Sequence, residues 1–106
     1  AITNGEISVK EHQKPSKDFE LMQNRPNPFD EATIIGVRVN QSQNVKEAFI
    51  SIRDMQRKEI ERLPIDLSSE VNEVLYHHGY GKVGTFAYTL VVDGQDKGTK
   101  MMVFAN

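Results

Sequence analysis

The sequence contains no cysteine and no tryptophan, and only 8% of its residues are aromatic. Without cysteine, neither a disulfide nor a thiolate metal site is possible, and cysteine usage leaves the redox compartment undecided. No apolar run approaches the roughly 20 residues that a membrane-spanning helix requires. A hydrophobic content of 38% and a charged content of 26% are instead typical of a globular domain.

An excess of charge of one sign is also missing. The formal net charge is −2, so the composition provides no electrostatic case for binding nucleic acid or inserting into an anionic membrane. The basic residues Arg53, Arg57, Lys58 and Arg62 are interleaved with Asp54, Glu59 and Glu61. Such a mixture predicts a solvated surface rather than a phosphate-binding site.

The sequence has no recognisable pattern of catalytic residues. No serine lies in the strained turn that a nucleophile requires, and the glycines of residues 79–84 lack the spacing of a phosphate loop. His77 and His78 are adjacent, so their side chains point to opposite faces of an extended segment. A metal site also needs further donors at ligand spacing. We therefore predict two surface histidines, no metal, no cofactor and no enzymatic activity.

The last third of the chain has the clearest strand signals. Between residues 85 and 92 the apolar side chains alternate, with Phe86, Tyr88, Leu90 and Val92 on one face. Asp93-Gly94 is a preferred pair for a type I′ hairpin turn. The chain then returns through residues 95–104, where Met102 and Phe104 share a face. These features predict a C-terminal β-hairpin.

The middle of the chain is less uniform. Residues 32–40 alternate cleanly and predict a half-buried strand whose inner face carries Thr33, Ile35, Val37 and Val39. In residues 45–63, apolar positions 45, 48, 49, 52, 55, 60 and 63 fit one helical face, whereas 48, 50 and 52 fit a strand. Pro64 predicts an edge strand or a break. The apolar residues within 70–76 do not follow a single two-residue alternation, and this pattern predicts a bulge.

Residues 23–29, Gln-Asn-Arg-Pro-Asn-Pro-Phe, stand out from the rest of the chain. Pro26 and Pro28 fix their own φ, favour extended backbone before them and cannot donate to a sheet ladder. The segment should therefore lie at a sheet edge or lead into a strand. Asn27 is then available to hydrogen-bond neighbouring backbone, and Phe29 provides a large apolar anchor. Physical considerations alone favour an ordinary proline-rich connection to a β-domain.

The order and spacing of several stretches nevertheless resemble one family. Leu21, residues 23–29 and Thr33-Ile34 are similar to the start of the C-terminal sorting domain of type IX secretion, found in cargo proteins of the Bacteroidetes. The resemblance continues in Gly-Thr-Phe-Ala-Tyr at 84–88, Val-Val-Asp-Gly at 91–94 and Thr-Lys-Met-Met-Val at 99–103. It covers residues 19–106. The chain departs from the family at Arg57, where a glycine is usual, and at Met101, where a second lysine is frequent.

The resemblance implies an all-β fold, an immunoglobulin-like β-sandwich of about seven antiparallel strands. It also favours two strands in residues 45–63, joined by a turn that begins at Asp54. Domains of this family fold in the periplasm after export and are read by an outer-membrane translocon and shuttle proteins. A cell-surface sortase then commonly removes them and anchors the cargo. The implied recognition residues are Asn24, Pro26, Asn27, Pro28, Phe29, Gly84, Asp93, Gly94, Lys100 and Met102.

Residues 1–18 are polar and contain turn signals, so we interpret them as a linker from a preceding cargo domain. The chain begins at Ala1 with neither a starting methionine nor a signal peptide, and we expect it to be a segment of a longer polypeptide. An exposed linker adapts readily to a protease cleft. Cleavage is therefore expected here, near the small or flexible residues Thr3, Asn4, Gly5 and Ser8.

Two alternatives remain open. Lys97 and Lys100 also fit simple protection of an edge strand against association, rather than recognition. The chain as a whole also fits a fibronectin-like spacer or a ligand-binding module of a secreted protein. A carbohydrate-binding surface of stacked aromatic side chains is unexpected, because the chain has no tryptophan.

Overall fold

A computed structural model describes residues 18–41, 44–79 and 83–105, and these form an all-β structure without a helix. The seven strands are β1 (Phe19–Leu21), β2 (Ala32–Val39), β3 (Ala48–Arg53), β4 (Glu59–Pro64), β5 (Val71–His77), β6 (Gly84–Val92) and β7 (Gln95–Phe104). All strand pairs are antiparallel. The prediction of an all-β sandwich of about seven antiparallel strands is confirmed.

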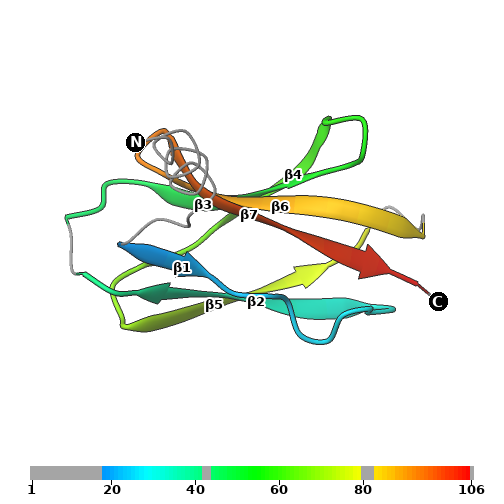
Figure 1. Ribbon diagram of the computed structural model, residues 1–106, viewed down its shortest axis with the longest axis horizontal. Coiled ribbons are helices and arrows are strands. Elements are labelled where there is room, and N and C mark those ends of the chain that lie inside the picture. Colours follow the sequence, from blue (N-terminus) through cyan, green and yellow to red (C-terminus); the bar gives the residue numbers. More distant parts are fainter. Residues whose placement is uncertain (1–17, 42–43, 80–82, 106) are drawn as a thin grey trace, which may run out of the picture.

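The strands form two sheets that lie one above the other (Figure 1). One sheet has the order β1-β2-β5 and the other β4-β3-β6-β7. Side chains from both inner faces fill the space between them, as expected for a sandwich. The fully buried ones include Phe19, Ile35, Val37, Ile50, Ile52, Tyr76, Tyr88, Leu90 and Met102. The inner-face residues predicted for β2 and β6 are buried, apart from the half-buried Val39. In β6, Thr89 and Val91 on the other face are buried as well.

The ambiguous residues 45–63 form two strands. β3 pairs with β6 along its whole length, and Ile50 and Ile52 are completely buried against the core. The helical pattern fails because Met55 is 58% exposed and because Phe49 lies on the outer face, under the guanidinium of Arg62. Tertiary pairing decides between two patterns that the local sequence leaves almost equal.

The turn between β3 and β4 begins at Asp54, as predicted. The Asp54 carboxylate accepts hydrogen bonds from the backbone N–H groups of Gln56 and Lys58 at 2.9 and 3.0 Å. Arg57 adopts a φ of 71°, a left-handed conformation that costs a side-chain-bearing residue roughly 1–2 kcal/mol. Arg57, which stands where the family that this chain resembles usually has glycine, therefore occupies a position that glycine fits best.

Arg57→Gly is expected to raise the free energy of unfolding by about 0.5–1 kcal/mol, because relief of the left-handed strain exceeds the extra entropy of an unfolded glycine. Urea denaturation of the variant and of Arg57→Ala measures this. The alanine control keeps the strained conformation and should show no gain. A glycine variant no more stable than the alanine variant would contradict the assignment of strain.

The prediction of a bulge in residues 70–76 is wrong. β5 pairs with β2 without a register shift, from Ala32 opposite His77 to Arg38 opposite Val71. Asn72 and Tyr76 are buried on its inner face, whereas Val71 and Leu75 are exposed on its outer face. The mixed phase in the sequence therefore reflects apolar side chains on both faces of a regular strand.

Pro64 lies in β4, an edge strand, as predicted.

The C-terminal hairpin has the predicted geometry. Asp93 and Gly94 both have positive φ, 49° and 83°, as a type I′ turn requires. β6 and β7 pair from Gly84 opposite Phe104 to Val92 opposite Gln95, with one register shift between Thr89 and Val91. Met102 and Phe104 are both buried, so the predicted shared face packs into the core.

Candidate functional site

Residues 23–29, called the proline segment from here on, join the two sheets at one end of the sandwich. The segment follows β1 and turns back before β2, close to the end of β7 (Figure 1). Arg25 forms an antiparallel bridge with Ile34 of β2, and Phe29 forms a parallel bridge with Phe104 of β7. Both proline peptide bonds, Arg25-Pro26 and Asn27-Pro28, are cis. The segment is thus tied to one sheet at its start and to the other at its end.

The proline segment covers the outer edge of the last strand. Val103 donates its backbone N–H to the Asn27 side-chain oxygen at 2.9 Å, and the Phe29 N–H donates to the carbonyl of Val103 at 3.0 Å. Ala105 N–H donates to the carbonyl of Phe29 at 2.9 Å. The Gln23 amide donates to the carbonyl of Met101 at 2.7 Å. Asn27 therefore hydrogen-bonds backbone, but its partner lies 76 residues along the chain and not in the neighbouring backbone that the sequence suggested.

Asn24 holds the start of the segment in place. Only 2% of its surface is exposed, and its amide nitrogen donates to the carbonyl of Pro26 at 3.1 Å and to the hydroxyl of Thr33 at 3.0 Å. The Thr33 hydroxyl in turn donates to the carbonyl of Pro26 at 2.8 Å. A buried, fully bonded side chain cannot be touched by a partner, so Asn24 positions the segment while Pro26, Asn27 and Pro28 are exposed.

Tyr88 connects the four-stranded sheet to the backbone on the other side of the core. This completely buried residue of β6 donates its hydroxyl to the carbonyl of Met22 at 2.7 Å. The same oxygen accepts the backbone N–H of Asn24 at 2.8 Å. Burial raises the pKa of Tyr88 to about 12, despite the opposing effect of the Asn24 N–H. Sequence reasoning placed Tyr88 in the core but missed this role, although a buried tyrosine hydroxyl usually requires a partner.

Phe29 is the anchor that its sequence position predicted. It is 3% exposed and packs edge to face against Phe104 and Tyr76, with centroid distances of 5.3 and 6.1 Å. His78 completes this aromatic cluster, 4.1 Å from the Phe104 ring and 4.7 Å from the Phe86 ring. The prediction of two surface histidines is thus correct for His77 only, because His78 is half-buried and shares a hydrogen bond with the Tyr76 hydroxyl.

The remaining residues implied by the resemblance lie in three places on the C-terminal hairpin. Gly84 and Met102 lie opposite Phe104 and Phe86, near the aromatic cluster. Lys100 lies opposite Tyr88, so its half-buried side chain starts on the inner face of the sheet. Asp93 and Gly94 lie at the other end of the hairpin. There the Asp93 carboxylate accepts the backbone N–H groups of Lys46 and Glu47 at 2.9 and 2.8 Å.

The predicted cleavage residues Thr3, Asn4, Gly5 and Ser8 lie outside the described residues. The same holds for all of the proposed linker except Asp18. The structure therefore brings the proline segment and the end of β7 together, places the turn at Asp93-Gly94 elsewhere, and leaves the cleavage prediction as a prediction.

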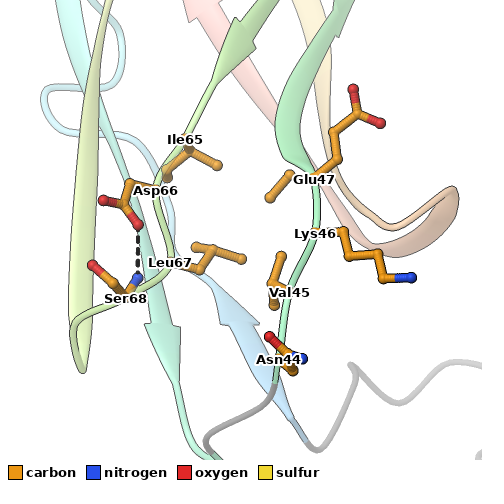
Figure 2. A pocket seen from close by; sticks show the side chains of 9 residues that line it. Asn44, Val45, Lys46, Glu47, Ile65, Asp66, Leu67 and Ser68 are labelled. Carbon is orange, nitrogen blue, oxygen red and sulfur yellow. Dashed lines mark hydrogen bonds between the residues drawn. The ribbon is translucent and has the colours of Figure 1, made fainter.

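An open cavity of about 480 Å³ lies between the residues that lead into β3 and those that follow β4. Val45 and Leu67 face each other across it, while the charged ends of Lys46 and Glu47 point away (Figure 2). The Asp66 carboxylate accepts the backbone N–H of Ser68 at 3.0 Å. The polar groups thus serve local turns and do not converge on a ligand. In the described part of the chain, no group of three or more histidines and carboxylates could hold a metal ion.

None of the described residues belongs to a helix that is long and apolar enough to span a membrane. No family model, curated protein or solved structure matches this chain.

Proposed function

We propose that this chain is a non-enzymatic C-terminal sorting domain that directs a covalently preceding cargo protein through the type IX secretion system. In this proposal the domain is exported to the periplasm and read by the outer-membrane translocon and its shuttle proteins. A cell-surface sortase then removes it and anchors the cargo outside the cell. The immunoglobulin-like type of the sandwich and the linker role of residues 1–18 belong to the same proposal.

The observation that carries the proposal is the contact between the proline segment and β7. The two stretches lie about 75 residues apart, as the Asn27–Val103 and Gln23–Met101 hydrogen bonds illustrate with separations of 76 and 78 residues. Both stretches carry the resemblance, and they form one continuous edge. A protein that reads the end of β7 must also meet the exposed Pro26, Asn27 and Pro28.

The buried residues of this edge explain how a small domain can present it in a fixed shape. Asn24, Thr33 and Tyr88 hold the backbone of the segment from inside, and Phe29 holds its end. A recognition surface held by packing and by saturated hydrogen bonds loses little conformational entropy on binding. In this proposal the buried residues hold the proline segment in shape, and the exposed residues contact the secretion machinery.

A reporter fused to the N-terminus of the chain tests the function. In a bacterium with a type IX system, the reporter should reach the cell surface or medium, and in an isogenic strain without the translocon it should stay in the periplasm. Equal location of the reporter in both strains would contradict the proposal and favour a spacer or ligand-binding module.

Lys100→Ala is expected to reduce delivery of this reporter severalfold while changing the free energy of unfolding by less than about 1 kcal/mol, because partly exposed charges contribute little to stability. Lys97→Ala, which removes another half-buried lysine of the same strand, is the matched control and should be delivered normally. Cell fractionation with an activity assay measures both. Equal delivery of Lys100→Ala and wild type would restrict Lys100 to edge protection.

A further inference from the structure

The two sheets have four edges, and three of them are protected. β1 has only three residues, and β4 contains Pro64 and several charged side chains. The end of β7 is covered by the proline segment, and its Lys100 starts on the inner face, a common protection of edge strands. β5 is the fourth edge. It is a regular strand of seven residues that contains no proline, glycine or lysine.

The backbone of β5 has its outward hydrogen-bonding groups on the odd-numbered residues. The Glu70 carbonyl accepts from Val39 N–H, and His78 N–H donates to the Glu31 carbonyl. The even-numbered residues between them therefore face β2, because the direction alternates along a strand. Val71, Glu73, Leu75 and His77 point their backbone groups away from β2. Within residues 18–41, 44–79 and 83–105, no segment pairs with this outer edge.

The side chains of these four residues are also exposed, on the outer face of the sheet. Val71 is 42% exposed and Leu75 is 54% exposed, so this short strand presents two large apolar side chains to solvent. Glu73 and His77 complete the row. The edge therefore combines backbone groups that no described segment pairs with and a row of apolar, acidic and imidazole side chains, which suits β-strand addition.

We propose that β5 pairs antiparallel with β5 of a second copy of this chain, which gives a two-fold symmetric dimer with a continuous six-stranded sheet. The proposal goes beyond the sorting function and does not depend on it. A two-fold axis at Leu75 places Leu75 opposite the partner's Leu75. It also places Glu73 of each copy opposite His77 of the other copy. Apolar pairs stabilise a sheet, and the Glu73 carboxylate can accept a hydrogen bond from the imidazole N–H of the partner's His77.

Other registers of the same edge are less favourable. Only odd-numbered residues can face odd-numbered ones, because these carry the outward backbone groups. An axis at Glu73 would place two carboxylates opposite each other, which destabilises a sheet. An axis at Val74 would place Glu73 opposite the partner's Leu75. The apolar Leu75 pair and the two carboxylate–imidazole pairs therefore favour the register that is centred on Leu75.

The dimer requires no rearrangement of the domain. Asn72, Val74 and Tyr76 keep their places on the inner face, and Arg25 already holds Glu73 on the outer face through a 2.6 Å ion pair. One strand from each copy buries far less than the roughly 1,000 Å² of a stable interface. We therefore expect weak association, with a Kd in the range of about 10 µM to 1 mM.

Sedimentation equilibrium of the full chain, up to about 1 mM, tests the proposal. Dimerisation is expected, and the amide protons of the four odd-numbered residues of β5 should exchange more slowly as concentration rises. Leu75→Lys should abolish the dimer. Val83→Lys, a change at a 59% exposed valine outside β5, should leave it intact. A wild-type chain that stays monomeric over the whole range would overturn the proposal.

A charge exchange tests the register. His77→Glu places two carboxylates opposite each other and should weaken the dimer about tenfold or more. Adding Glu73→Lys to the same chain places opposite charges across the interface and should restore the dimer. Circular dichroism confirms that both variants remain folded. If the folded double variant associates no better than the single variant, Glu73 does not lie opposite the partner's His77.

Discussion

Phe29→Ala is expected to lower the free energy of unfolding by about 3–5 kcal/mol, the cost of truncating a buried aromatic side chain. Phe29 is 3% exposed and lies between the two sheets, against Tyr76 of one sheet and Phe104 of the other. Its removal leaves a cavity at the place where the proline segment meets β7. This loss is a large share of the roughly 5–15 kcal/mol that stabilises a domain.

Chemical denaturation of the variant and of Met102→Ala separates the two roles of Phe29. Met102 is fully buried in β7, so its truncation should cost about 2–5 kcal/mol but leave the proline segment in place. Only Phe29→Ala should also speed amide exchange at Val103 and Ala105, whose N–H groups bond to the segment. A cost below about 1 kcal/mol for Phe29→Ala would contradict its role as the anchor.

Tyr88→Phe is expected to cost about 2–3 kcal/mol at neutral pH, because it leaves the carbonyl of Met22 and the N–H of Asn24 without their partner. The phenylalanine ring fills the same space, so the loss reports on the hydroxyl alone. Thermal or urea denaturation measures it. A loss of only a few tenths of a kcal/mol would show that the tyrosine hydroxyl does not connect the two sides of the core.

The same hydroxyl predicts a specific loss of stability in alkali. The folded pKa of Tyr88 is raised to about 12, whereas an unfolded tyrosine ionises near pH 10. Its contribution is therefore fully present below pH 10 and is lost as pH rises from about 10 to about 12, by roughly 2–3 kcal/mol. The difference in stability between wild type and Tyr88→Phe should shrink over this range, since the other tyrosines and lysines are common to both. A constant difference from pH 9 to pH 12 would contradict the assignment.

The strands that could be predicted are those whose pairing is local or whose faces differ strongly. β6 and β7 are joined by a two-residue turn, and β2 places Thr33, Ile35, Val37 and Val39 on one face and Gly36 and Arg38 on the other. Residues 45–63 could not be assigned from their own pattern, because burial of Ile50 and Ile52 depends on pairing with β6, about 40 residues away. The bulge predicted in β5 was wrong because exposed Val71 and Leu75 imitate a change of phase.

The candidate site was predictable as a list of residues but not as an arrangement. The sequence indicated a stiff segment with an apolar anchor, and both are present. It could not show that Asn24 is buried, because the partners Thr33 and Tyr88 come from two other strands. The same applies to His78, whose aromatic neighbours come from four different parts of the chain.

Recognition of the junction of the proline segment and β7 by the secretion machinery, as proposed, predicts a difference between two variants. Asn27→Ala removes an exposed side chain of the junction and its bond to Val103. Asp54→Ala removes two turn bonds between β3 and β4. Each change should cost about 1–2 kcal/mol of stability.

The deciding measurement is surface delivery of a reporter fused to each variant, in a type IX secretion strain, with the unfolding free energy of each measured in parallel. We predict that Asn27→Ala is delivered severalfold less than wild type, while Asp54→Ala is delivered like wild type. Equal delivery of Asn27→Ala and Asp54→Ala at equal stability would contradict the claim that the machinery reads this junction.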